Sequence, residues 1–257
     1  MSLTKRYAVE LAYRGTAYSG WQRQPNAISV EETLDTALST IFGEPIKLVG
    51  CGRTDAGVHA TDYVAHFDMK GDLPPRILGR LNRYLPADIA LRRFVEVPQD
   101  FHARFHATGR EYDYRLSLSK DPFRPDTVSW LPALGDLNTE VMQEAASLLL
   151  RYEAFATFCK TNSDAYTMRC EMRHSYWTFG DGEWVYRVGA NRFLRGMVRL
   201  IVGMCLQVGE GKLSLEQVVD ALDQQRRLPR PLSAPPEGLF LSAVHYSNRT
   251  TWTGVTY

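Results

Sequence analysis

A short glycine-containing segment, 50-GCGRTDAGVHA-60, holds an arginine and a carboxylate two positions apart, the residue types best suited to chemistry. Glycines on both sides let the backbone take unusual angles and approach a substrate closely, and Arg53 offers a planar cation. Asp55 could therefore act as a nucleophile or a base without a metal. In a partly dry cleft it would stay ionised only beside a cation. The same residue types are equally compatible with a turn in which Asp55 accepts hydrogen bonds from its own backbone.

A nucleotide-binding glycine loop is a weaker interpretation of this segment. Such a loop needs a helix directly after its glycines, so that the amides at the start of the helix can meet phosphates. Here the chain continues into 62-DYVAHFDM-69, which alternates like a strand, and Gly57 stands at the wrong spacing.

A metal site is also weakly supported. The candidate ligands are Asp55, His59 and Asp62, or the pair His102 and His106. Neither histidine pair lies on a convincing helix, and no cysteine or glutamate supports them at ligand spacing. Hydrogen-bonded histidines are the simpler interpretation.

The hydrophobic pattern places Asp55 within a first half of alternating strands and helices. Ser29 stands three residues before Glu32, which is the spacing of a capping box, and Gly43 is typical of a helix end. Pro74 and Pro75 suit the first turn of a second helix. The predicted strands cover 5–13, 46–49, 62–69 and 89–97, and the predicted helices cover 30–42 and 74–85.

The second half repeats this theme with different lengths. Asn138 suits the N-cap of a helix that ends near Tyr152, and Gly180-Asp181-Gly182 suits a turn between two strands. The apolar pattern from Phe193 to Val208 is the best helix in the chain. The predicted strands of this half cover 110–118, 171–179, 183–190 and 239–246.

Together these elements predict an α+β fold made of two similar α/β halves, with largely antiparallel sheets flanked by helices. The N-terminal half, 1–105, carries the Asp55 loop, and the C-terminal half, 106–257, completes an active-site cleft between them. Ligand sites favour such clefts. Architecture alone does not decide between a polyanion and a small molecule as the substrate.

Charge and cysteine content limit the class of protein. The formal net charge is only +1, but arginines cluster at 76–83, 92–93, 192–199 and 226–230, so a positive face is compatible with the neutral total. Each cluster taken alone is equally typical of a solvated helix surface. The four cysteines form no C-x-x-C pair, and no signal peptide or membrane-length apolar window is present. A cytoplasmic protein with reduced thiols is expected.

Five collinear segments resemble the tRNA pseudouridine synthase A family. The glycine segment contains 52-GRTDAGVHA-60, and the others cover 11–25, 101–116, 189–203 and 233–246, which together span nearly the whole chain. The stretch between Phe158 and Arg173 matches the pattern of the family poorly.

The resemblance implies the pseudouridine synthase fold and the isomerisation of uridine to pseudouridine at nucleotides 38 to 40 of the tRNA anticodon stem-loop. It implies no cofactor, no metal and a homodimer. Asp55 would be the essential carboxylate, and Arg199 would be its cationic partner. Tyr112 would pack on the target base and is a candidate for the deprotonation at C5, and Leu239 would form an apolar wall. Arg53 would fill the stack vacated by an extruded base or hold a flanking phosphate.

Two rival hypotheses remain at this level. The basic clusters and aromatic residues would also suit a non-catalytic RNA-binding module. A nucleotide-dependent metabolic enzyme built on 50-GCG-52 would instead bind ATP or NAD and ignore RNA.

Overall fold

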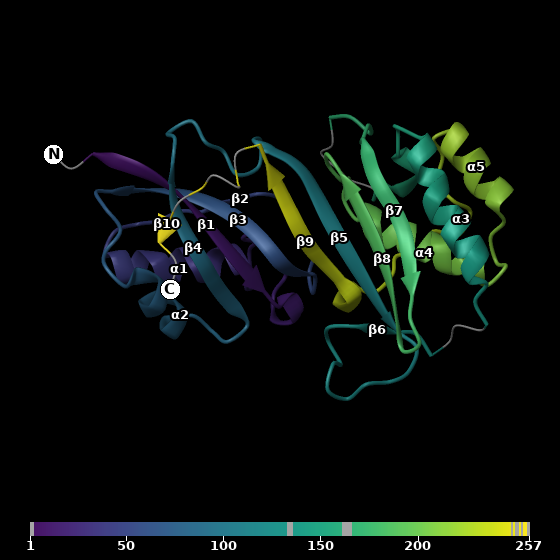
Figure 1. Ribbon diagram of the computed structural model, residues 1–257, viewed down its shortest axis with the longest axis horizontal. Coiled ribbons are helices and arrows are strands. Elements are labelled where there is room, and N and C mark those ends of the chain that lie inside the picture. The colour runs from purple at the N-terminus through teal and green to yellow at the C-terminus, as the bar shows by residue number, and fades with distance from the viewer. Residues whose placement is uncertain are drawn as a thin grey trace. The chain divides into compact units, whose positions relative to one another are not determined.

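The structure, a computed structural model, describes residues 3–132, 136–160, 166–247, 249, 252, 254 and 255 (Figure 1). The chain divides into two compact units. Unit 1 comprises Met1–Thr108 and Leu241–Tyr257, and unit 2 comprises Gly109–Phe240. Residues 241–257, which the sequence analysis assigned to the C-terminal half, thus belong with the N-terminal unit. The division of catalytic roles between the two halves stays a prediction.

Unit 1 is built on an antiparallel sheet. Tyr13, the last residue of its first strand, is paired with both Ala60 and Ile89, so the end of β1 meets the starts of β3 and β4. The strand order is β10-β4-β1-β3-β9, and β2 pairs with β3. The strands are β1 (Thr4–Tyr13), β2 (Val49–Gly50), β3 (His59–Lys70), β4 (Ile89–Val97), β9 (Leu239–Tyr246), whose first two residues belong to unit 2, and β10 (Gly254–Val255).

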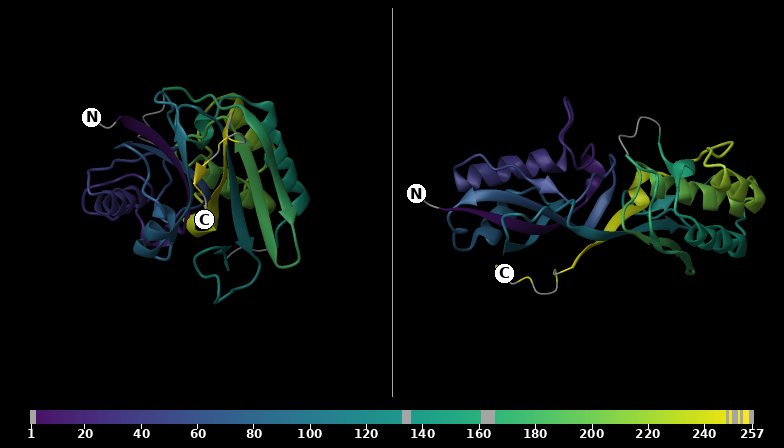
Figure 2. Two further views of the ribbon diagram at one scale, coloured as in Figure 1. Left: turned by 60° about the vertical axis from the view of Figure 1, so that its left-hand side comes forward. Right: turned by 90° about the horizontal axis from the view of Figure 1, so that it is seen from above.

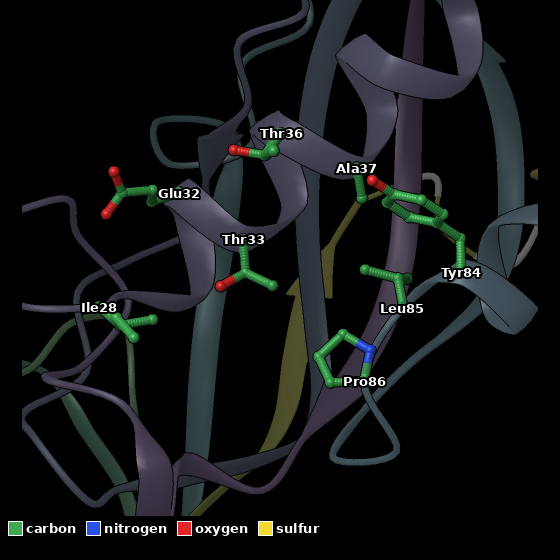
Figure 3. Close-up of a pocket in the computed structure, with 8 residues that line it drawn as sticks. All are labelled: Ile28, Glu32, Thr33, Thr36, Ala37, Tyr84, Leu85 and Pro86. Carbon is green, nitrogen blue, oxygen red and sulfur yellow. The ribbon is translucent and has the colours of Figure 1, made fainter.

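Two helices complete unit 1, α1 (Val30–Phe42) and α2 (Ile77–Tyr84). The side chain of Ser29 accepts a hydrogen bond from the backbone N–H of Glu32, and Gly43 ends α1 in the left-handed conformation at φ 72°. These two helix-end predictions are confirmed. The helices border a groove of about 380 Å³, and Ala37 and Tyr84 line its walls (Figure 3).

The strand predicted at 46–49 is largely wrong, because only Val49 and Gly50 join the ladder. Side chains of α1 hold the preceding residues instead. The backbone N–H of Ile46 donates to Ser39 Oγ at 2.9 Å, and that of Leu48 donates to Asp35 Oδ1 at 2.9 Å. Helical residues thus satisfy backbone groups that a strand partner would otherwise satisfy.

Unit 2 contains the antiparallel order β5-β8-β7, with the short β6 parallel to β5. Figure 2 shows α3, α4 and α5 gathered beside β7 and β8, and α3 packs against both β7 and α4. Nearly every residue of α4 is buried. The elements are β5 (Ala107–Ser117), β6 (Ser129–Trp130), β7 (Met172–Phe179), β8 (Glu183–Ala190), α3 (Thr139–Leu148), α4 (Met197–Gly209) and α5 (Leu215–Asp223).

Two helices of unit 2 differ from their predictions. The helix predicted from Phe193 begins at Met197, because Gly196 stands before it in the left-handed conformation at φ 69°. Helix α5 was not predicted, although its signal is present. Ser214 and Gln217 form a capping box, and Val218 and Leu222 follow at helical spacing on the buried side.

The predicted α+β class is confirmed by the mixture of helices and mainly antiparallel strands. Short 3-10 helices join the main elements at Gly15–Ala17, Leu149–Arg151, Ala156–Phe158 and Pro236–Gly238. Among the described residues, no helix is both long and apolar enough to cross a membrane. Part of the poorly matching stretch 159–170, residues 161–165, lies outside the described residues.

Candidate active site

The Asp55 loop connects β2 to β3 at the end of the unit 1 sheet where β1 finishes. Its side chains alternate in exposure: Arg53 is exposed, Thr54 is buried and Asp55 is half-buried. The backbone N–H of Val58 donates to the Asp55 carbonyl at 3.2 Å, and Gly57 takes φ 78° between them. The loop therefore buries its threonine and offers its arginine to solvent.

Three aromatic residues, Tyr13, Tyr63 and Trp21, support the loop. The hydroxyls of Tyr13 and Thr54 lie 2.8 Å apart at a buried position, and the Tyr63 hydroxyl donates to the Gly52 carbonyl at 2.5 Å. The rings of Trp21 and Tyr63 are stacked with centroids 4.0 Å apart. No role was predicted for these residues, although Tyr13 and Trp21 lie within the 11–25 segment.

The segment 15–21, which follows β1, also contacts the loop. Gly20 lies so close that a Cβ there would stand 2.3 Å from the Thr54 carbonyl oxygen, and its φ is +94°. The backbone N–H of Gly57 donates to the Tyr18 carbonyl at 3.2 Å. Glycine at position 20 is thus required both by its conformation and by the close approach of two backbones.

The candidate metal ligands serve other contacts. His59 Nδ1 accepts a hydrogen bond from the backbone N–H of Gly15 at 2.9 Å, and Asp62 forms an ion pair with Arg249. The rings of His102 and Phe105 are tilted against each other with centroids 4.2 Å apart. Within the described ranges, no group of three or more His, Cys, Asp or Glu residues is arranged to hold a metal ion.

The glycine-loop hypothesis lacks its structural requirement. No helix follows directly after Gly52, and the chain enters β3 at His59 instead. Helix-terminal amides are therefore not presented to a phosphate at this loop.

Tyr112 lies on β5, opposite Val188 of β8. Its ring meets that of Phe193 edge to face, with centroids 5.1 Å apart, and the residue is half-buried. Such an arrangement fixes the plane of the tyrosine ring. Phe193, which the sequence analysis took as the start of a helix, instead helps to orient Tyr112.

Arg199 is the third residue of α4 and is fixed by two hydrogen bonds to one residue. Its Nε donates to the Ala234 carbonyl at 2.5 Å, and the backbone N–H of Ala234 donates to the Arg199 carbonyl at 3.0 Å. Burial raises the pKa of Tyr114, while the charge of Arg199 acts in the opposite direction. Arg199 thus lies near the buried face of β5.

Leu239 begins β9 and is buried, with 5% of its surface exposed. The preceding Gly238 lies against β5, since a Cβ there would stand 2.6 Å from the Arg115 carbonyl oxygen and 3.0 Å from Tyr114 Cζ. Tyr114 therefore has both Arg199 and the residue before Leu239 as neighbours.

The candidate residues are thus distributed over both units. Arg53 and Asp55 share one loop of unit 1, and Tyr112, Arg199 and Leu239 belong to unit 2. Each of the five has a defined place on a loop, strand or helix.

Comparison with known proteins identifies the family. The family model for tRNA pseudouridine synthase matches residues 11–106 and 145–247. A protein named tRNA pseudouridine synthase A from Porphyromonas gingivalis is 45% identical over 94% of this chain and 97% of its own length. The chain belongs to the tRNA pseudouridine synthase family.

Further relatives carry the same name. The tRNA pseudouridine synthase A of Bacteroides thetaiotaomicron is 45% identical over 94% of this chain and 91% of its own length. That of Chlamydia trachomatis is 39% identical over 97% of this chain and 95% of its own length. The tRNA pseudouridine synthase match includes Arg53, Asp55, Arg199 and Leu239, while Tyr112 lies between the two matched ranges.

Proposed function

We propose that the chain isomerises uridine to pseudouridine in the anticodon stem-loop of tRNA, at nucleotides 38 to 40. The observation that carries this proposal is the Asp55 loop of a tRNA pseudouridine synthase family member. In this loop Asp55 is half-buried, and the hydroxyl of the preceding Thr54 lies against that of Tyr13. A fixed loop presents a reactive group in one orientation, which favours catalysis over simple binding.

Asp55 starts the reaction in one of two ways. Either its carboxylate attacks C1′ of the sugar, or it removes a proton from the sugar, and in both cases the glycosidic bond to N1 breaks. The freed uracil turns and forms a bond from C5 to C1′. This step releases the Asp55 carboxylate from C1′ or, after proton abstraction, is accompanied by return of the proton to the sugar. C5 then loses its proton and N1 gains one, so that the product has the same atoms as the substrate. The overall reaction needs no oxidant, reductant or cofactor.

Three residues of unit 2, Arg199, Tyr112 and Leu239, assist the Asp55 carboxylate in this proposal. Arg199 is our proposed cationic partner of the Asp55 carboxylate. Tyr112 packs its ring on the target base, which contributes about 1–3 kcal/mol of stacking, and is our candidate for accepting the C5 proton. Leu239 provides an apolar wall for the uracil. The contacts of Arg199 with Ala234 and of Tyr112 with Phe193 support these roles by limiting side-chain motion.

Arg53 assists the opening of the RNA. A base stacked in a stem must leave the stack before a carboxylate can reach its sugar, at a cost of a few kcal/mol. The exposed guanidinium of Arg53, two residues from Asp55, can occupy the vacated space or bind the flanking phosphate. We further propose that the chain acts as a homodimer in the cytoplasm.

The position of the modification tests this function. Anticodon stem-loop transcripts with a single uridine at nucleotide 38, 39 or 40 are incubated with the protein, and pseudouridine is mapped by carbodiimide modification and primer extension. The proposal predicts stops at these nucleotides and none when the uridine is moved elsewhere in the stem. Binding without any stop in these transcripts or in full-length tRNA would instead favour a non-catalytic RNA-binding module.

A further inference from the structure

Helix α2 of unit 1 and the residue before it carry three arginines. Arg80 and Arg83 lie three residues apart on one side of the helix, and Arg76 is the N-cap residue, so the three are spread over about 10 Å of the helix axis. All three are exposed, whereas Ile77, Leu78 and Leu81 on the other side are buried. We call the three arginines the α2 arginine row.

The row lacks anionic partners among the described residues. Throughout the part of the chain that the structure describes, no carboxylate forms an ion pair with Arg76, Arg80 or Arg83. The nearest acids along the sequence are engaged elsewhere, Asp72 with Lys5 and Asp88 with the Tyr18 hydroxyl. Many other arginines are paired, namely Arg6, Arg23, Arg93, Arg124, Arg169, Arg226 and Arg249.

The placement of the row is unfavourable for the isolated protein. Arg76 occupies the N-cap of α2 with φ 56°, a left-handed conformation that is unfavourable for a non-glycine residue. A positive charge at the start of a helix also opposes the helix dipole, and the first turn contains no acidic residue. A bound anion would relieve the repulsion among these charges.

The helix that carries the row is fixed to the sheet. The side chain of Asn82, between Arg80 and Arg83, donates to the Leu91 carbonyl at 2.8 Å and accepts from the Leu91 backbone N–H at 2.7 Å. This double hydrogen bond fixes α2 to β4. The helix backbone is therefore already ordered before any partner binds, which lowers the entropic cost of binding.

The row also leads away from the catalytic loop of the same unit. Shortly after α2 ends, Asp88 accepts hydrogen bonds from the Arg14 backbone and from the Tyr18 hydroxyl. The Tyr18 carbonyl in turn accepts from Gly57 of the Asp55 loop. Because these contacts connect the segment after α2 to the loop, Arg83 lies nearer to the Asp55 loop than Arg76 does.

From these observations we infer that the α2 arginine row binds the phosphate backbone of the tRNA outside the anticodon stem-loop. The inference rests on the proposed function for the identity of the polyanion. Guanidinium groups match the geometry of phosphate oxygens, and a row of them neutralises successive phosphates without reading bases. The row therefore adds affinity for the whole tRNA and does not take part in the chemical step.

The test uses the full chain with Arg76→Gln, Arg80→Gln and Arg83→Gln combined. Its control combines Arg124→Gln, Arg169→Gln and Arg226→Gln, which lowers the net charge equally but removes exposed arginines that already have carboxylate partners. A third variant replaces the row by lysines and keeps the charge. Thermal melts check folding, and fluorescence anisotropy measures binding to full-length tRNA and to the isolated anticodon stem-loop over a range of salt concentrations.

The row variant is expected to bind full-length tRNA about tenfold more weakly, with a slope of log affinity against log salt reduced by about 2–3. The lysine variant keeps the slope, and binding of the isolated stem-loop is unchanged in all variants. An equal loss in the control, an unchanged salt slope, or an equal loss on the stem-loop would overturn the inference.

Failure of the proposed function would be seen separately. The native protein would then release no tritium from uridine labelled at C5, whatever the binding data show. Weaker tRNA binding by the row variant would still support the inference in that case.

Discussion

The hydroxyl groups of Tyr13 and Thr54 lie 2.8 Å apart, at a buried position directly before Asp55 in the chain. Strand β1 thereby fixes the residue next to the proposed catalytic carboxylate. The aromatic stack of Trp21 and Tyr63 completes the support, since the Tyr63 hydroxyl also bonds to Gly52 of the loop.

Tyr13→Phe tests this support. Removing the hydroxyl leaves the buried Thr54 hydroxyl without this partner and is expected to lower the free energy of unfolding by about 1 kcal/mol. A small displacement of Asp55 should also slow single-turnover isomerisation by about tenfold. Tyr7→Phe is the matched control, because Tyr7 lies on the same strand as Tyr13 and its hydroxyl donates to the Gly71 carbonyl. Equal turnover rates for the two variants would contradict a role of Tyr13 in positioning the loop.

Gly20→Ala should displace the loop through backbone contact. The added Cβ would stand 2.3 Å from the Thr54 carbonyl oxygen, so that the loop or the 15–21 segment must move. Gly43→Ala is the control, since Gly43 also has a positive φ, of 72°, but open space around it. Both variants lose stability in urea unfolding, by about 1 kcal/mol for Gly43→Ala. Only Gly20→Ala should also lose most of its turnover, and full turnover in that variant would refute the close fit.

Arg53→Ala separates binding from opening of the RNA. Arg53 is exposed, and no described residue pairs with it, so the melting temperature should not change. The proposed role in base extrusion predicts a single-turnover rate lowered by about tenfold or more, because extrusion costs a few kcal/mol. Arg53→Lys keeps the charge and should restore binding more than turnover. Weaker binding with a normal single-turnover rate would exclude the extrusion role.

His66 makes the stability of the fold depend on pH. Burial lowers the pKa of His66 to about 4, and the charges of Arg6 and His102 act in the same direction, while Asp68 acts against them. The unfolded chain, with a histidine pKa of about 6.5, binds the proton more readily. Stability is therefore fully present above pH 6.5 and is lost as the pH falls towards 4.

Urea unfolding near pH 7.5 and pH 5 measures this effect. The free energy of unfolding of the native chain should fall by about 2 kcal/mol more than that of His66→Gln, which cannot titrate. His106→Gln provides a control at an exposed histidine of the same unit. Parallel behaviour of native protein and His66→Gln would show that this histidine does not carry the pH dependence.

Local sequence patterns predicted most of the helices and strands, because the bounds of these elements depend mainly on nearby residues. The strands predicted at 89–97 and 239–246 match β4 and β9 in their bounds. The segment 46–49 could not be judged in this way, because its backbone is satisfied by Ser39 and Asp35 of a helix. The pairing of residues 241–246 with unit 1 likewise depends on contacts that are distant in sequence.

The site was predictable in its chemistry but not in its support. Asp55 and Arg53 stand out by type and spacing, and family resemblance added the roles of Tyr112, Arg199 and Leu239. No local pattern indicates that Tyr13 reaches Thr54, or that Phe193 orients Tyr112. Those contacts exist only once strands and loops from separate parts of the chain have come together.

The most direct test of the central claim is tritium release from full-length tRNA labelled at uridine C5, comparing the native chain with Asp55→Asn. The substitution keeps the shape of the side chain and removes its charge, so that tRNA binding measured in parallel should be unchanged. The proposed mechanism predicts release by the native protein and none above background by the variant. Equal release by both proteins would show that the Asp55 carboxylate does not drive the isomerisation.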